Sequence, residues 1–166
     1  MRAGVALGAN LGDRLLCLTN ARNRIFALPE IAMPLLSSAL YETEPVDCEP
    51  GAAPFLNAVI EIGFVGSSRQ LLEQLKRIES DLGRPPARDR NRSRTIDLDL
   101  LYHGMRILDE PQLQVPHPRL HLRGFVLRPL AEIRPNLVLP GKRKTIHEMT
   151  RELPLTPSVV RSALQW

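Results

Sequence analysis

Cysteine and aromatic residues are scarce in this chain of 166 residues. Its two cysteines, Cys17 in a predicted helix and Cys48 in a predicted loop, match no metal or redox spacing. We therefore expect ordinary reduced thiols. Phe, Trp and Tyr together make up 4% of the residues. The few rings that are present include Phe55 and Phe125, each of which can either pack in a core or line a ligand site.

Long apolar runs are also missing from the sequence. No stretch approaches the roughly 20 apolar residues that span a bilayer. The apolar run at residues 3–9 is broken at Asn10, so it is too short for the core of a signal peptide. With 43% hydrophobic and 24% charged residues, the composition predicts a globular cytoplasmic protein with one domain over residues 1–166.

The excess of positive charge is confined to one short segment. Residues 84–94 hold five arginines and a single acid, Asp89, which gives this segment a net charge of +4. The whole chain also has a net charge of +4, so the remaining residues are balanced. A broad basic face for nucleic acid is therefore not needed to explain the charge. Arginines clustered in a loop beside Gly83 and Pro85 indicate an anion clamp.

Two carboxylates follow this segment inside an apolar strand pattern. Asp97 and Asp99 are two residues apart, so on a strand their side chains share one face, while Ile96, Leu98 and Leu100 point into a core. Mg²⁺ suits such a pair, because it takes one or two carboxylates together with substrate phosphates. The alternative is an edge strand whose polar face is simply hydrated. The neighbouring arginines favour a site for a metal and a polyphosphate.

The apolar periodicity predicts an α+β fold in the order βαββαβ. Strands are expected at residues 2–8, 33–41, 56–65 and 95–102, and helices between Asp13 and Pro29 and over residues 69–82. This order is that of a ferredoxin-like core. A turn at Gly104 predicts a short extra hairpin. The proline-rich remainder predicts a C-terminal extension with short helices, at about 119–132 and 145–152.

Six short strings of residues, taken together, resemble the 6-hydroxymethyl-7,8-dihydropterin pyrophosphokinase family of folate biosynthesis. They are residues 7–12 (LGANLG), 41–45 (YETEP), 55–58 (FLNA), 94–99 (RTIDLD), 115–118 (VPHP) and 123–130 (RGFVLRPL). The resemblance extends from the first strand to about residue 149. It implies that the pterin hydroxymethyl oxygen attacks the β-phosphorus of ATP, so that the β,γ-diphosphoryl unit is transferred and AMP leaves.

The resemblance also implies how the catalytic residues act. Two Mg²⁺ ions would be held by Asp97 and Asp99, and Arg84 and Arg94 would compensate the charge of the transferred unit. The residue pattern fits this chemistry independently, since phosphoryl-type transfer depends on positioning and charge neutralisation. A Walker-type glycine loop with lysine is absent from the sequence, so that nucleotide-binding motif is not used.

The remaining site residues follow from the resemblance position by position. Those expected to bind the pterin are Thr43, Glu44, Val46, Phe55, Asn57 and Phe125. Those expected to bind ATP are Leu72, Lys76, Glu79, Arg84, Arg88, Leu100, His117 and Arg123. Taken singly, several have ordinary structural alternatives: a core position for each phenylalanine, a turn histidine for His117, and an amphipathic helix surface for Leu72, Lys76 and Glu79.

The chain departs from the family pattern in its arginine-rich loop. Asn91 stands where some members have tryptophan, and Ala87 stands where some have a basic residue. The contacts that close this loop are therefore unassigned. We expect residues 84–93 and 44–54 to act as lids that order on ATP binding and exclude water.

Two other functions fit parts of the pattern. A small RNA-binding module shares the βαββαβ order, but Leu98 and the two aspartates stand where it would need outward-facing aromatic rings. A two-metal phosphodiesterase could use the same aspartates, but no motif supplies further acidic ligands. We expect a monomer that acts on the small molecules ATP and 6-hydroxymethyl-7,8-dihydropterin, without nucleic-acid or membrane partners.

Overall fold

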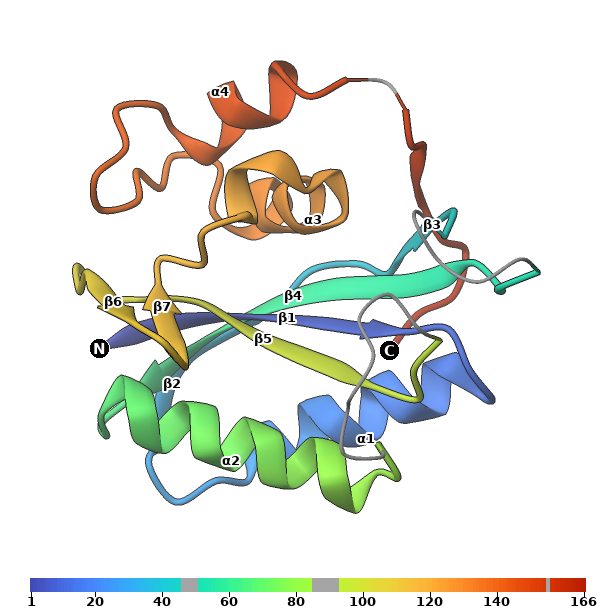
Figure 1. Cartoon of the computed structure of the whole chain (residues 1–166), viewed down its shortest axis with the longest axis horizontal. Coiled ribbons are helices and arrows are strands. Elements are labelled where there is room, and N and C mark those ends of the chain that lie inside the picture. The colour runs from blue at the N-terminus through green and yellow to red at the C-terminus, as the bar shows by residue number, and fades with distance from the viewer. Residues whose placement is uncertain (46–50, 85–92, 155) are drawn as a thin grey trace.

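The chain forms a mixed α+β fold in which one sheet lies between two layers of helices (Figure 1). Helices α1 (Arg14–Phe26) and α2 (Ser68–Asp81) cover one face, and α3 (Gly124–Ile133) and α4 (Ile146–Arg151) cover the other. Within the described ranges, no helix combines the length and apolar character that crossing a bilayer requires. The computed structural model describes residues 1–45, 51–84, 93–154 and 156–166.

Every strand pairing in the main sheet is antiparallel. Its six strands are β1 (Arg2–Ala9), β2 (Ile31–Ser37), β3 (Tyr41–Thr43), β4 (Phe55–Phe64), β5 (Asp97–His103) and β8 (Val159–Arg161). The order is β5-β1-β4-β3-β8, and β2 also pairs with β4. The hairpin predicted after Gly104 is formed by β6 (Leu108–Glu110) and β7 (Leu113–Val115).

Side-chain caps begin three of the helices. Asp13, where the sequence predicts that the first helix begins, accepts the Leu16 amide at the start of α1. Ser67 forms a capping box with Gln70 at α2, and Thr145 forms one with Glu148 at α4. Each cap satisfies backbone N–H groups that the first helical turn leaves without partners.

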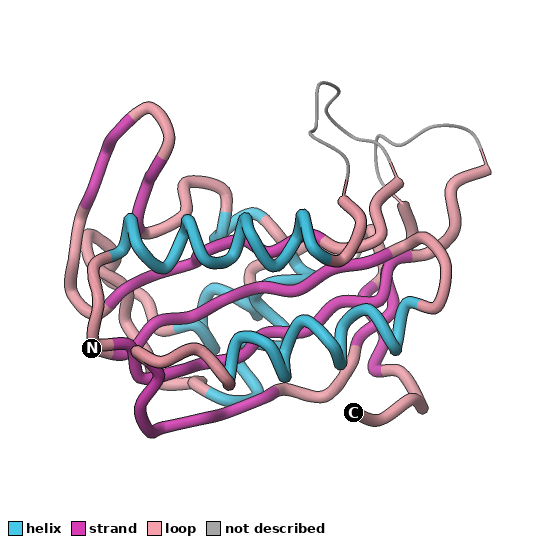
Figure 2. Tube along the Cα trace, turned by 90° about the horizontal axis from the view of Figure 1, so that it is seen from below, coloured by secondary structure: helices cyan, strands magenta, loops and turns pink. Residues whose placement is uncertain are grey.

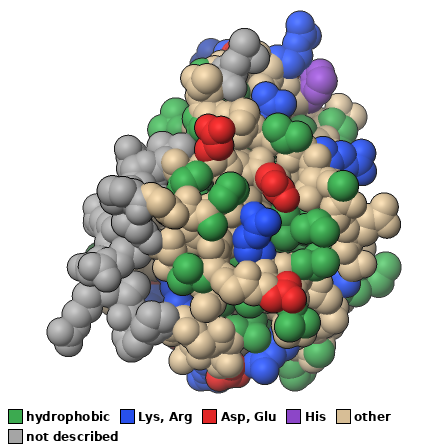
Figure 3. Space-filling view, turned by 90° about the vertical axis from the view of Figure 1, so that its right-hand side faces the viewer, with side chains coloured by type: hydrophobic (Ala, Val, Ile, Leu, Met, Phe, Trp, Pro, Cys, Tyr) green, Lys and Arg blue, Asp and Glu red, His purple; other side chains and the backbone are tan. Residues whose placement is uncertain are grey.

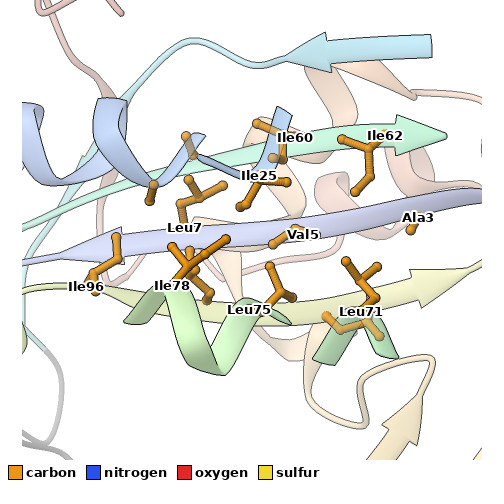
Figure 4. Packing of buried hydrophobic residues seen from close by; sticks show 14 of the residues in the cluster. Ala3, Val5, Leu7, Ile25, Ile60, Ile62, Leu71, Leu75, Ile78 and Ile96 are labelled. Carbon is orange, nitrogen blue, oxygen red and sulfur yellow. The ribbon is translucent and has the colours of Figure 1, made fainter. Parts of the chain in front are cut away.

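The main core lies between the sheet and the helix pair α1 and α2, which run side by side across this face (Figure 2). Ile96 and Leu98 are fully buried in it, as predicted from their alternation with the aspartates. Figure 4 shows how residues from β1, β4, α1 and α2 interdigitate. A second cluster, with Val59, Leu101 and Leu127, packs α3 onto the opposite face. The sheet is thus buried on both sides over most of its length.

The predicted strand at 33–41 is wrong in its extent, because the chain forms two strands there. β2 pairs with β4 from Ile60 to Phe64, whereas β3 pairs with it from Phe55 to Asn57. Between them, the Ser38 hydroxyl accepts the Val59 amide at 3.1 Å and donates to the Ala39 carbonyl at 2.7 Å. The hydroxyl takes the place of a backbone acceptor for the Val59 amide, while the Ser38 amide still donates to the Val59 carbonyl at 2.9 Å, and the strand is interrupted there.

The C-terminal extension also differs from the prediction. The single helix expected at 119–132 is a 3₁₀ turn (Leu120–Leu122) followed by α3, which continues through Pro129. Pro129 is buried with Val126, Leu127 and Leu130, so packing offsets the hydrogen bond that proline cannot make. The extension also contains a strand, β8, which the sequence did not predict and which pairs with β3.

A buried ionic cluster fastens α3 to the sheet. The Glu61 side chain is fully buried, and Arg134, at the C-terminal end of α3, donates to both of its oxygens at 2.7 and 3.0 Å. The Tyr102 hydroxyl donates to Glu61 at 2.6 Å, and Arg2 does so at 3.1 Å. A Cβ at Gly4 would lie 2.2 Å from the Tyr102 ring. Glycine at this position therefore lets Tyr102 reach across β1 to Glu61.

The His103 side chain gives the fold a pH-dependent stability. It is fully buried, and its Nδ1 lies 2.8 Å from the Ser68 hydroxyl. Burial lowers the pKa of His103 from its ordinary value of 6.5, and Arg106 and the amino group of Met1 lower it further. Since the folded-state pKa is below the unfolded-state value, the stabilisation is present above that value and is lost as the pH falls through the folded-state pKa.

Urea unfolding should therefore give a smaller free energy of unfolding at a pH of about 5 than at about 8. His103→Gln should reduce this difference, because it removes the buried group that must take up a proton. The exposed His147 supplies a control, and His147→Gln should keep the wild-type pH dependence. An unchanged pH dependence in His103→Gln would overturn the assignment.

Candidate active site at the end of β1

One row of paired residues crosses three strands where β1 ends and β4 and β5 begin. Gly8 on β1 pairs with Asn57 on β4 and with Asp97 on β5. Directly paired residues point to the same face, so Asn57 and Asp97 flank Gly8 on the side of the sheet that α3 covers. A Cβ at Gly8 would lie 3.0 Å from the Asn57 amide oxygen. Glycine keeps the space between the two side chains open.

Two arginines contact Asp97. Arg84 Nη1 donates to Asp97 Oδ1 at 2.7 Å, and Arg94 Nη1 donates to Oδ2 at 2.7 Å. Arg84 follows α2 and Arg94 precedes β5, so the two guanidinium groups approach from the two ends of the arginine-rich segment. The structure thus brings Asp97, Arg84 and Arg94 together, three residues that the sequence analysis named as catalytic candidates. Their catalytic roles stay predictions.

Asp99 contacts residues that follow β7. Arg123, at the start of α3, donates to Asp99 Oδ2 at 3.0 Å, and His117 Nε2 lies 4.0 Å from the same oxygen. His117 Nδ1 accepts the Arg119 amide at 3.2 Å, which leaves Nε2 as the protonated nitrogen of a neutral ring. Burial lowers the pKa of His117, with Arg123 and Arg119 acting the same way and Asp99 opposing them.

Glu79 connects α2 to β5, the strand that carries Asp97 and Asp99. Its side chain is 3% exposed and is contacted by Arg84, by Lys76 Nζ at 2.9 Å and by the Leu98 amide at 2.7 Å. Burial raises the pKa of Glu79, although Lys76, the Leu98 amide and Arg84 oppose this shift. The amphipathic-surface alternative for this residue is therefore wrong, because the carboxylate faces inward and positions Arg84.

Asn57 and its neighbours on β3, which are among the residues expected at the pterin, lie on the β4 side of Gly8. Asn57 Nδ2 donates to Thr43 Oγ1 at 2.7 Å, and both side chains are 5% exposed. Phe55 pairs with Thr43 and is only partly buried. Phe125 is also partly buried, and the Arg123 guanidinium lies 5.5 Å from its ring centre. Neither ring is a fully buried core residue, so both retain surface for a ligand.

For the other predicted site residues that the structure describes, it gives the degree of burial but no contact within the site. Glu44 is exposed, Leu72 is partly buried, and the side chain of Leu100 is 4% exposed. Val46, Arg88 and the departures at Ala87 and Asn91 lie outside the described residues, as do residues 85–92 of one predicted lid and 46–50 of the other.

Sequence reasoning missed the role of Asn10, which it treated only as the residue that breaks the apolar run at 3–9. The Asn10 side chain is buried and accepts the Arg94 amide at 2.6 Å. It also donates to the Ser93 hydroxyl at 2.9 Å and to the Ala53 carbonyl at 3.3 Å. No local sequence pattern predicts these contacts, because the partners are 43 to 84 positions away in the chain.

The charges around the aspartates suit a site that takes phosphate and a cation. The carboxylates of Asp97 and Asp99 are paired with Arg84, Arg94 and Arg123. Among the described residues, no group of three or more His, Cys, Asp or Glu side chains could hold a metal by itself. A pair of carboxylates fits Mg²⁺ nonetheless, because that ion completes its coordination with water and substrate phosphates.

Figure 3 views this end of the molecule from outside. Acidic, basic and hydrophobic side chains are interspersed across the centre of its described surface. An extended basic field, as a nucleic-acid-binding face requires, is not seen on that part of the surface. The positive charge of the site is instead held close to its carboxylates.

Comparison with known proteins shows which family this chain resembles. The family model for 7,8-dihydro-6-hydroxymethylpterin-pyrophosphokinase (HPPK) matches residues 4–135. The 2-amino-4-hydroxy-6-hydroxymethyldihydropteridine pyrophosphokinase of Bacillus subtilis is 42% identical over 131 residues, covering 79% of this chain and 77% of that protein. The enzyme of the same name from Pseudomonas aeruginosa is 39% identical over 144 residues, covering 86% of each chain.

Longer proteins contain the same unit. The folic acid synthesis protein fol1 of Pneumocystis carinii is 38% identical over 136 residues, which are 82% of this chain and 18% of fol1. The crystal structure of Plasmodium falciparum HPPK-DHPS wild type with pteroate matches with a TM-score of 0.67 and 16% identity, covering 91% of this chain and 42% of that one. At that identity the likeness shows the fold alone. The chain belongs to the 7,8-dihydro-6-hydroxymethylpterin-pyrophosphokinase family.

Proposed function

We propose that this chain transfers the β,γ-diphosphoryl group of ATP to the hydroxymethyl group of 6-hydroxymethyl-7,8-dihydropterin and releases AMP. The observation that carries the proposal is the row Asn57, Gly8 and Asp97, which sets an amide suited to a heterocycle beside a carboxylate suited to a metal. Neighbouring strands in a sheet lie about 4.8 Å apart, so the two side chains are roughly 10 Å apart across β1. That spacing accommodates a bound pterin beside a polyphosphate.

The metal belongs to the carboxylate side of this row. Asp97 and Asp99 would hold two Mg²⁺ ions, with substrate phosphates and water as the remaining ligands. The metal supplies neutralisation of phosphate charge, which phosphoryl-type transfer requires. Because both carboxylates are already paired with arginines, binding exchanges some of these ion pairs for contacts between arginine and phosphate.

The arginines and their neighbours position ATP. Arg84 and Arg94 are held beside Asp97, where a guanidinium can neutralise charge on the transferred diphosphoryl unit. Arg123 and the Nε2–H of His117 present donors beside Asp99. Lys76 is held at Glu79, on the side of α2 that leads to Arg84. Together they form a cationic cradle that orients the phosphates without a glycine loop.

The pterin would lie between Phe55 and Phe125, with its edge at Asn57. An amide side chain offers both a donor and an acceptor, which suits the amidine-like edge of a pterin. The bond between Asn57 and Thr43 fixes the orientation of that amide. Glu44 and Val46, which follow β3 along the chain, complete the proposed set. Exclusion of water by the ring pair would protect the diphosphoryl group from hydrolysis.

We further propose that β1, α1, β2, β4, α2 and β5 form a ferredoxin-like core, since the strand order β5-β1-β4-β2 agrees with this arrangement. On this proposal, residues 1–166 act as one pyrophosphokinase domain and as a monomer.

Product analysis with each component omitted in turn tests the proposed reaction. The purified chain should form AMP when ATP, Mg²⁺ and 6-hydroxymethyl-7,8-dihydropterin are all present. Omission of any one of them should stop AMP formation. AMP formation without the pterin would instead indicate a phosphodiesterase, and no AMP in the complete mixture would refute the proposal.

Loss of an aromatic ring should weaken pterin binding selectively. Phe55→Leu and Phe125→Leu should each raise the KM for the pterin by about three- to tenfold, because ring stacking contributes about 0.5–1.5 kcal/mol. The KM for ATP should stay close to the wild-type value. Phe26→Leu, in a partly buried ring on α1, is the matched control and should change neither constant. Equal effects on both KM values would contradict the assignment.

A further inference from the structure

Asn10 lies between the two segments that the proposed reaction must bring together. Its side chain is 2% exposed and sits directly after β1, at the end of the sheet that carries Gly8. A buried amide needs partners for its oxygen and both hydrogens. In this chain those partners come from Ala53, Ser93 and Arg94, and none from the α1 helix that follows.

The first set of contacts fixes the segment that enters β5. The Asn10 amide oxygen accepts the Arg94 N–H at 2.6 Å. The backbone N–H groups of Asn10 and Leu11 both donate to the Arg94 carbonyl, at 3.0 and 3.2 Å. The Arg94 peptide is therefore held on both sides. Its guanidinium contacts Asp97, so the placement of this backbone determines where the charge lies.

The second set of contacts fixes the segment that enters β4. Asn10 Nδ2 donates to the Ala53 carbonyl at 3.3 Å, and Arg14 Nη1 donates to the neighbouring Pro54 carbonyl at 2.8 Å. These two residues lead directly into Phe55 and, two positions later, Asn57. The connection between β1 and α1 thus reaches both halves of the site.

We infer that Asn10 is a positioning residue that sets the distance between Arg94, just before β5, and the entry of β4. The inference rests on the proposed function, because it assigns phosphate to Arg94 and the pterin to Phe55 and Asn57. Asn10 itself touches neither reacting group. It fixes the Arg94 backbone through its oxygen and the Ala53 carbonyl through its nitrogen, so the two binding regions form one rigid unit.

Two variants separate these contacts. Asn10→Ala removes all three side-chain contacts, whereas Asn10→Asp keeps an oxygen for the Arg94 N–H and loses the donor to Ala53 and Ser93. Asn10→Ala should lower kcat by about 10- to 100-fold, the usual effect of misplacing a charge by about 1 Å. Asn10→Asp should recover most of kcat but keep a raised KM for the pterin. Asn20→Asp, at an exposed position of α1, is the matched control and should match the wild type.

A double-mutant cycle with Arg94→Ala tests whether Asn10 affects kcat through the Arg94 side chain. If Asn10 acts through the Arg94 side chain, Asn10→Ala should lower kcat far less in the Arg94→Ala background. An undiminished loss in that background would overturn the inference. So would identical kinetics for Asn10→Ala and Asn10→Asp, because a generally loosened fold would not distinguish the retained oxygen from the lost donor.

Backbone amide exchange of the ligand-free protein tests whether Asn10 holds the Arg94 backbone, and it does not depend on an activity measurement. The Arg94 amide should lose protection in Asn10→Ala and keep it in Asn10→Asp. Unchanged protection in Asn10→Ala would contradict the positioning role even in an active enzyme. Conversely, failure of the wild-type chain to form AMP would refute the proposed reaction, while this exchange pattern would still report on the Asn10 contacts.

Discussion

Asp97→Asn is expected to retain the fold and to lose turnover by about 10³-fold, because metal neutralisation contributes several kcal/mol to phosphoryl-type transfer. The amide is nearly isosteric with the carboxylate but carries no charge. It would weaken Mg²⁺ binding and would also remove the carboxylate that Arg94 contacts and one of the two that Arg84 contacts, the other being Glu79. Turnover and thermal unfolding, measured on the same preparation, separate lost catalysis from lost structure.

Asp109→Asn is the matched control for this variant. Asp109 lies on β6, is exposed, and accepts a hydrogen bond from Gln114 at 2.7 Å. Its replacement should leave turnover close to the wild-type value. Calorimetric titration with a non-hydrolysable ATP analogue and Mg²⁺ gives a second readout, in which Asp97→Asn should lose the Mg²⁺-dependent part of the affinity. Near-normal turnover in Asp97→Asn would rule out Asp97 as a metal ligand.

Glu61→Ala is expected to destabilise the fold by about 1–3 kcal/mol, because it leaves the buried Tyr102 hydroxyl without an acceptor and the partly buried Arg134 without its counterion. Arg134, Arg2 and Tyr102 all contact the Glu61 carboxylate, whose side chain is fully buried. Burial raises the pKa of Tyr102, and its bond to Glu61 raises it further, so the hydroxyl stays a proton donor to this carboxylate. Urea unfolding gives the free-energy difference directly.

The exposed Glu73 on α2 provides the control for the Glu61 variant. Glu73→Ala should change the free energy of unfolding by less than about 0.5 kcal/mol, as is typical of surface positions. Because Arg134 ends α3 and Arg123 begins it, Glu61→Ala should also disturb the site at the opposite end of that helix. A loss of less than about 1 kcal/mol in Glu61→Ala would contradict the buried ion-pair account.

The parts of the site that the sequence predicted correctly depend on local periodicity. Strand alternation alone places Asp97 and Asp99 on one face and buries Leu98 on the other. The same pattern predicted β1, β4 and α2 to within one or two residues of their observed ends. In these elements, the regular spacing of the apolar residues along the chain determines which face is buried.

The contacts that the sequence did not predict join residues far apart in the chain. Glu61 meets Arg134, Glu79 faces inward to the Leu98 amide, and Asn10 meets Ala53 and Arg94. Such pairings are determined by strand register and by the packing of loops, neither of which leaves a periodic signal. The interruption between β2 and β3 has a similar origin, because it depends on a bond from Val59 to the Ser38 hydroxyl.

Phosphorus NMR of the reaction mixture tests the central claim most directly, because it identifies which phosphoryl unit moves. With ATP, Mg²⁺ and 6-hydroxymethyl-7,8-dihydropterin, the chain should produce AMP together with two mutually coupled phosphorus resonances of a diphosphate ester on the pterin. ADP with a single phosphoryl ester, or AMP with free pyrophosphate, would contradict the proposed transfer. The same spectrum recorded with Asp97→Asn should show unreacted ATP.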